Sequence, residues 1–154
     1  MAAYNVPLNG VTTSVTDDSL TLVTAAAGVG SRIYIYEYFV GGINGSSAMS
    51  SNALARSTGG TTPGGAITPT PLDSNSSATL GFSAYTTWGV GTQPTLGTAF
   101  VDMPTFQGQG GQYKFFAAPD RPIVVGSGAA ALNLSFRCIS AVSVINASFK
   151  IELP

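Results

Sequence analysis

The stretch that decides the fold is SRIYIYEYFVGG, residues 31–42, the longest unbroken run of strongly β-preferring side chains in the chain. Side chains alternate across a strand, so its two faces are Ile33, Ile35, Glu37 and Phe39, and opposite them Tyr34, Tyr36, Tyr38 and Val40. Both faces are bulky, which predicts a central strand covered on both sides. We expect the chain itself to cover Tyr36. Glu37 is expected near Arg32 or another cation on a neighbouring strand.

The composition is apolar and carries little charge. With 154 residues the chain is long enough for one domain with a real core, so we expect a single domain over residues 1–154. Apolar residues make up 44% of it and charged residues only 8%, about a third of the usual charged share. Because a soluble monomer relies on surface charge to stay dispersed, this composition predicts a surface covered by other protein or made of neutral serine, threonine and glycine.

Charge and titratable groups disfavour several classes of function. Six basic and seven acidic residues give a net charge of −1, with no basic run, so we expect no binding of nucleic acid or of an anionic membrane. The sequence has no long apolar run and no secretory pattern at its start, which favours a soluble protein made in the cytoplasm. Histidine is absent, and the single cysteine, Cys138, lies in an apolar segment that favours a buried thiol.

Short β-patterned segments separated by turn signals run through the chain, and no segment shows a helical period. The predicted strands, besides 31–42, lie at 11–15, 19–25, 48–57, 78–88, 99–106, 112–117, 122–125, 131–139 and 142–153. In the segment 131–139, Leu134, Phe136 and Cys138 alternate with polar residues, which predicts one face in the core.

The remaining segments complete the predicted architecture. We expect an outer strand at 48–57 and a loop at 89–98. The proline-rich segment 58–71 is expected to be a loop, or to form an edge strand around 66–72 in which prolines block pairing from outside. Residues 1–9 are expected to form an extended N-terminal arm. Together these patterns predict an all-β protein, a single antiparallel β-sandwich of jelly-roll or Greek-key type.

No group of residues carries a strong catalytic or cofactor signal. The segment 126–131, GSGAAA, matches a GxGxxA pattern, but a dinucleotide site requires a helix next and a β pattern follows, so a hairpin turn is predicted. Asp17 and Asp18 could hold a hard cation together with Asp73, Asp102 or Asp120, but no cation-binding spacing is present, which favours a solvated turn. Glu37 with Asp102 or Asp120 stays open as a carboxylate pair. We expect a non-enzyme that has no cofactor and no metal.

Several motifs together resemble those of a known class of proteins. They are RIYIYEYFV at 32–40, a Gly/Thr/Pro stretch that ends in TPTPLD at 68–73, a strand containing Trp88, and PDRPIVVG at 119–126 followed by a closing pair of strands. The chain in this order resembles small structural proteins of tailed-bacteriophage particles, including head decoration, or cement, proteins with jelly-roll-like folds. The resemblance implies a virion protein that binds the capsid, or other virion proteins, and its own copies, often as trimers.

On this interpretation the arm and two loop regions contact neighbouring subunits or the capsid. The candidate contact residues are Ala2, Tyr4, Val6, Pro7, Pro63, Pro69, Pro71, Trp88 and Val90. The alternatives are a carbohydrate- or receptor-binding β-sandwich module of a phage tail fibre, and another tail or tube subunit. A sugar-binding platform would draw on an exposed Trp88 and on tyrosines. The aromatic residues weighed for such a platform, or for a subunit contact, are Tyr34, Tyr36, Tyr38, Tyr85, Trp88, Tyr113, Phe115 and Phe116.

Overall fold

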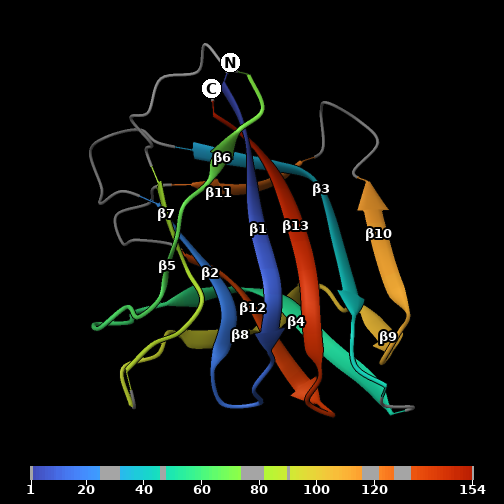
Figure 1. Cartoon of the computed structure of the whole chain (residues 1–154). Helices are drawn as coiled ribbons and strands as arrows, with labels where there is room; N and C mark the ends of the chain where they lie inside the picture. Colours follow the sequence, from blue (N-terminus) through green and yellow to red (C-terminus); the bar gives the residue numbers. More distant parts are fainter. Residues whose placement is uncertain are drawn as a thin grey trace.

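The structure, a computed structural model, describes residues 2–24, 32–45, 48–73, 82–89, 91–115, 122–126 and 133–153. Over these residues it consists of strands, turns and bends, with no helix. The strands form two antiparallel sheets that pack face to face (Figure 1). This confirms the predicted β-sandwich.

Six strands form sheet A and seven form sheet B. Sheet A runs in the order β10–β3–β13–β1–β6, with β11 also paired to β3. Its strands are β1 (Ala2–Thr12), β3 (Arg32–Gly42), β6 (Thr70–Pro71), β10 (Gly111–Phe115), β11 (Ile123–Gly126) and β13 (Val144–Leu153). Sheet B runs in the order β5–β7–β2–β12–β4–β8, with β9 also paired to β4. Its strands are β2 (Asp18–Thr24), β4 (Met49–Thr58), β5 (Ala66–Ile67), β7 (Phe82–Tyr85), β8 (Thr95–Asp102), β9 (Thr105–Gln107) and β12 (Asn133–Ser140).

The last two strands insert between the first four. Strands β1 and β3 lie in sheet A with β13 between them, and β2 and β4 lie in sheet B with β12 between them. Such crossed-over neighbours are typical of jelly-roll and Greek-key sandwiches. Both sheets are therefore completed only when the C-terminal strands pair with the N-terminal ones.

The expected N-terminal arm is wrong, because that segment belongs to the sandwich. Residues 2–9 form most of β1, which pairs with β13 on one side and with β6 on the other. Tyr4 and Val6 are 3% and 0% exposed and lie in the core. Alternate apolar side chains explain this outcome, because a segment with one apolar face lowers its free energy by covering a core.

Strand β3 is central, as predicted, with β13 on one side and β10 and β11 on the other. Its alternation is interrupted by a bulge: Lys150 of β13 lies opposite Glu37, and the next residue of β13 lies opposite Ile35, which leaves Tyr36 as an extra residue. The inward face therefore changes from Ile35 to Tyr38, which is 1% exposed. The expectation that the chain covers Tyr36 is met only in part, because Tyr36 is half-buried.

The short segments between the sheets match their prediction as edges. Strand β5 lies at the edge of sheet B and β6 at the edge of sheet A, so the proline-rich segment passes from one sheet edge to the other. Proline lacks the N–H that a further strand would need. Prolines thus lie in or near both edge strands: Pro71 is part of β6, and Pro69 lies two residues after the end of β5.

Three other expectations are corrected. Strand β4, expected on the outside, lies between β12 and β8. The loop predicted at 89–98 ends at Thr95, where β8 begins. The strands on either side of the GSGAAA segment, β11 and β12, lie in different sheets and so do not form a hairpin; residues 127–132 of that connection lie outside the described residues.

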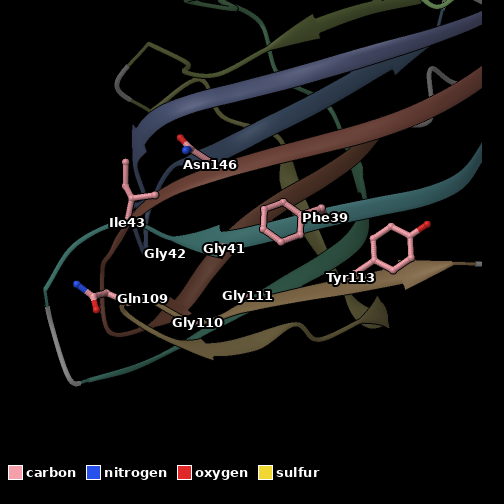
Figure 2. A pocket seen from close by; sticks show the side chains of 9 residues that line it. All are labelled: Phe39, Gly41, Gly42, Ile43, Gln109, Gly110, Gly111, Tyr113 and Asn146. Carbon is pink, nitrogen blue, oxygen red and sulfur yellow. The ribbon is translucent and has the colours of Figure 1, made fainter.

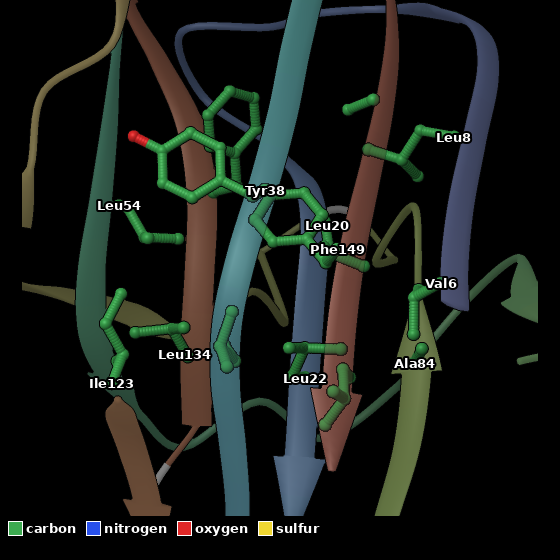
Figure 3. Packing of buried hydrophobic residues seen from close by; sticks show 14 of the residues in the cluster. Val6, Leu8, Leu20, Leu22, Tyr38, Leu54, Ala84, Ile123, Leu134 and Phe149 are labelled. Carbon is green, nitrogen blue, oxygen red and sulfur yellow. The ribbon is translucent and has the colours of Figure 1, made fainter. Parts of the chain in front are cut away.

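One apolar core fills the space between the sheets (Figure 3). Leu134 and Phe136 of β12 face it, and both are buried, as the alternation predicted. Phe149 of β13 lies between two rings, with ring centroids 5.4 Å from Tyr38 and 5.9 Å from Phe136. Cys138 is also buried, as expected.

Candidate functional site

The residues that the sequence singled out as contacts do not gather on one surface. Tyr4 and Val6 fill the core, so their side chains are not available to a partner. Ala2 and Pro7, on the same strand, are half-buried. Val90 lies outside the described residues.

The three candidate prolines also differ in their exposure. Pro63 and Pro71 are exposed, whereas Pro69 is buried between the two short edge strands. Pro63 forms an isolated β-bridge with Trp88, and Pro71 lies opposite Tyr4 in the pairing of β6 with β1. Only Pro63 and Pro71 of this set present an exposed side chain.

Trp88 belongs to a pair of loops that covers the outer face of sheet B. Residues 59–65 bond to residues 86–89 and 91–94 through several backbone hydrogen bonds, among them Gly64 N–H to Thr87 O at 2.7 Å and Gly89 N–H to Thr62 O at 3.0 Å. The indole of Trp88 is half-buried, and its Nε1–H donates to Thr21 Oγ1 at 2.9 Å. The exposed platform expected of Trp88 is therefore wrong.

Under this loop pair lies a buried polar network centred on Asp18. Its carboxylate accepts a hydrogen bond from Thr21 Oγ1 at 2.7 Å and a second from the hydroxyl of Ser135. The carboxylate also forms an ion pair with Arg137, whose Nε lies 2.7 Å away. The side chain of Asp18 is 0% exposed and that of Arg137 is 15% exposed. The prediction of a solvated turn is wrong for Asp18, whereas Asp17 is half-buried in the turn.

The network ties the loop pair to the sheet. Arg137 also donates to the carbonyl oxygen of Pro94 at 3.0 Å, and the backbone N–H of Asp18 donates to Gln93 Oε1 at 3.2 Å. Ser135, whose hydroxyl donates to Asp18, is 0% exposed, so no substrate reaches it in this conformation. The arrangement holds residues 91–94 in place and satisfies the buried charges.

A second carboxylate links the two sheets. Asp102 of β8 accepts a hydrogen bond from the hydroxyl of Tyr38 at 2.6 Å and forms an ion pair with Lys114, whose Nζ lies 3.1 Å away. Burial and the Asp102 carboxylate raise the pKa of Tyr38, so its hydroxyl stays protonated and donates. Burial alone would raise the pKa of Asp102, but the bonds from Tyr38 and Lys114 outweigh it and hold that pKa below its ordinary value.

The lowered pKa of Asp102 predicts a pH dependence of stability. A carboxyl whose pKa is lower in the folded state stabilises the fold at any pH above its unfolded value, about 3.9. That contribution is lost as pH falls through the folded-state pKa. We expect Asp102→Asn to lower the free energy of unfolding at pH 7 by about 1–3 kcal/mol and to reduce the loss of stability between pH 4 and pH 2. Urea unfolding over that pH range measures both effects.

Glu37 sets the background for this measurement. Hydrogen bonds from Lys150 and Tyr113 lower its pKa, so the Asp102→Asn variant keeps part of its acid sensitivity. Asp17→Asn, in a half-buried turn position, is the control and should lose as much stability between pH 4 and pH 2 as the wild type. If the Asp102→Asn variant loses as much stability between pH 4 and pH 2 as the wild type, the carboxylate does not link the sheets as described.

Glu37 itself lies where the sequence placed it. Its carboxylate is ion-paired with Lys150 of the neighbouring strand β13 and accepts a hydrogen bond from the hydroxyl of Tyr113 on β10. The prediction of a cation on a neighbouring strand is confirmed, and the cation is Lys150. Glu37 and Asp102 each bind a lysine and a tyrosine hydroxyl, an arrangement that suits structural anchors.

One feature that the sequence did not locate is a set of exposed apolar side chains at the edge of sheet B that β8 forms. It comprises Phe100, Val101 and Met103, which are 41%, 39% and 48% exposed. The register between β4 and β8 shifts twice along this edge, so apolar side chains of β8 point outward instead of alternating with inward ones. The signal available in the sequence was the run Ala99–Phe100–Val101, three apolar residues that do not alternate with polar ones. We refer to Phe100, Val101 and Met103, these three residues, as the apolar edge.

Among the residues that the structure describes, no three histidine, cysteine, aspartate or glutamate side chains come close enough together to hold a metal ion. The same residues include no helix that could span a membrane. Comparison of the chain with protein-family models, with curated proteins and with solved structures finds no match.

Proposed function

We propose that the protein is a non-enzymatic structural subunit of a virus particle, a capsid decoration or cement protein that binds the capsid surface and its own copies. The observation that carries the proposal is the apolar edge of sheet B. Phe100, Val101 and Met103 lie within four residues of one another and all are exposed, and clustered exposed apolar side chains mark protein–protein contact sites. The resemblance to phage decoration proteins points to the same kind of contact.

Charge at the apolar edge supports a protein partner. Asp102 lies within the edge, but its carboxylate is already bound by Tyr38 and Lys114. The edge therefore offers apolar side chains and little free charge, which suits a neutral, apolar partner surface. Only 8% of the chain is charged, and surface charge is what keeps a monomer dispersed in water. A contact at the apolar edge would therefore cover a surface that few charges help to keep soluble.

The irregular pairing of β8 indicates what kind of contact this edge makes. Bulges in an edge strand disfavour the addition of a further strand, and the register between β4 and β8 shifts twice. We therefore expect partners to meet the side chains of Phe100 and Val101 and not to extend the sheet. Pro63 and Pro71, both exposed, stay as candidate contacts of the proline-rich segment.

A paired set of variants tests the assembly. We expect the wild-type protein to form oligomers, with the trimer favoured, and to sediment with phage heads prepared without it. The double variant Phe100→Ser/Val101→Ser should weaken both associations by about tenfold or more, since it removes two apolar anchors. Light scattering after gel filtration and co-sedimentation measure these effects.

The control removes equally exposed apolar surface elsewhere. Val15 and Val142 are 51% and 50% exposed and lie in turns outside the apolar edge, so Val15→Ser/Val142→Ser should assemble like the wild type. If the wild-type protein is a monomer that fails to bind heads, the proposal is wrong. If both double variants weaken assembly equally, the apolar edge is not the contact.

A further inference from the structure

A shallow hollow lies on the outer face of sheet A, where β3 and β10 pair near their glycine-rich ends (Figure 2). Its volume is about 380 Å³, within the range of small-molecule sites. Two aromatic rings, two carboxamides and a set of glycines surround it, and none of the described residues that line it is charged. The lining residues are Phe39, Gly41, Gly42, Ile43, Gln109, Gly110, Gly111, Tyr113 and Asn146.

Glycines let the ring of Phe39 lie close against the sheet. A Cβ atom at Gly41 would come within 2.8 Å of the ring of Phe39, and one at Gly111 within 2.9 Å. Both distances are shorter than any normal carbon contact. The two glycines therefore let the ring of Phe39 lie close over the backbone, where it lines the hollow together with Tyr113.

Tyr113 is an exposed ring that is held in one place. It lies directly opposite Phe39 in the pairing of β10 with β3 and is 59% exposed. Its hydroxyl donates to Glu37, and Glu37 is ion-paired with Lys150. Because its hydroxyl is already bonded, Tyr113 presents its ring face to a ligand. Its side chain has already lost part of its conformational entropy, so that ordering it on binding costs less.

Carboxamides supply the polar contacts of the hollow. Asn146 Oδ1 accepts a hydrogen bond from the N–H of Gly10 at 2.8 Å, which orients the amide and leaves its Nδ2 group to donate. Gln109 lies on the other side of the hollow (Figure 2) and offers both a donor and an acceptor. The site thus combines an anchored aromatic face with neutral amides.

We propose that this hollow binds a neutral pyranose residue of a glycan. A pyranose ring has an apolar C–H face, which stacks on the ring of Tyr113, and hydroxyl groups around its rim, which bond to Asn146 and Gln109. A neutral ligand fits because the lining residues that the structure describes carry no charge. The hollow is open and takes about one sugar ring, so each copy binds weakly, with a Kd of about 1 mM or above.

A titration of the purified chain followed by NMR tests this site. The probes are the methyl pyranosides of glucose, galactose, mannose and N-acetylglucosamine, each added up to about 50 mM, a range that covers millimolar binding. We expect at least one of them to shift the backbone amide signals of Gly41, Gly42, Gly110 and Gly111 along a saturating curve. If none of the four does so, the proposal is overturned.

Variants locate the contact. Tyr113→Ala and Asn146→Ala should each weaken binding of that sugar by about tenfold or more, through loss of stacking and of the amide donor. Tyr113→Phe keeps the ring but loses the bond to Glu37, so we expect binding weaker by about three- to tenfold.

The matched control is Phe115→Ala, since Phe115 lies on the same strand, is 56% exposed and does not line the hollow. It should bind like the wild type. Equal losses in Tyr113→Ala and Phe115→Ala would place the contact outside the hollow. Because the titration needs only the isolated chain, its failure is distinct from a failure of the assembly proposal.

Discussion

We expect Asp18→Asn to lower the free energy of unfolding by about 3–5 kcal/mol, because breaking a buried ion pair leaves its partner charge uncompensated. Arg137 would keep its bond to the Pro94 carbonyl but lose its carboxylate. The hydroxyls of Thr21 and Ser135 both donate to Asp18 Oδ2 and Arg137 Nε donates to Oδ1, so the single oxygen of an amide cannot accept all three bonds. Asparagine has nearly the shape of aspartate, so the loss reports charge and hydrogen bonding and not packing.

Urea unfolding at pH 7, followed by circular dichroism, measures this loss. The matched control is Asp17→Asn, the preceding carboxyl, which is half-buried and should change stability by about 1 kcal/mol or less. Arg137→Met should also destabilise the fold strongly, since it leaves Asp18 buried without its cation. The double variant should lose less than the sum of the two single losses. An Asp18→Asn loss as small as that of Asp17→Asn would show that the network does not hold a buried charge.

Phe149→Ala is expected to lower the free energy of unfolding by about 3–5 kcal/mol. The side chain is fully buried and lies between Tyr38 of the same sheet and Phe136 of the other. Removing it deletes its ring contacts with both sheets and leaves a cavity that rigid strands cannot close. Phe149→Leu, which keeps most of the volume, should lose only about 1–2 kcal/mol.

The control for this prediction is another phenylalanine that contributes little packing. Phe115 is 56% exposed, so Phe115→Ala should stay within about 0.5 kcal/mol of the wild type. Denaturant midpoints at constant slope give all three values. A Phe149→Ala loss no larger than that of Phe115→Ala would contradict the central position of this ring.

Much of the strand content followed from local sequence patterns. Alternation predicted that Leu134 and Phe136 face the core, and prolines predicted the edge position of the 66–72 segment. Glu37 was expected beside a cation and is paired with Lys150. These predictions depend on side chains a few residues apart. The alternation of apolar residues and the missing N–H of proline have the same effect whichever strand is the partner.

The candidate sites followed less well, because they depend on which strands meet. A bulge opposite β13 places Tyr38 in the core where strict alternation pointed to a uniform tyrosine face. Asp18 is buried because a loop pair from elsewhere in the chain covers it. The hollow joins Phe39 and Asn146, residues far apart in the sequence, through the neighbouring strands β3 and β13.

By itself, the sequence determined that this protein is built of strands, which of its strand faces are apolar, and that it carries little charge. The tertiary structure alone decided that residues 2–9 complete a sheet, that Asp18 is buried, and that apolar side chains of β8 stay exposed at an edge. The reason is physical: side-chain alternation is a local property of a strand, whereas register, bulges and the covering of a sheet face depend on contacts between distant segments.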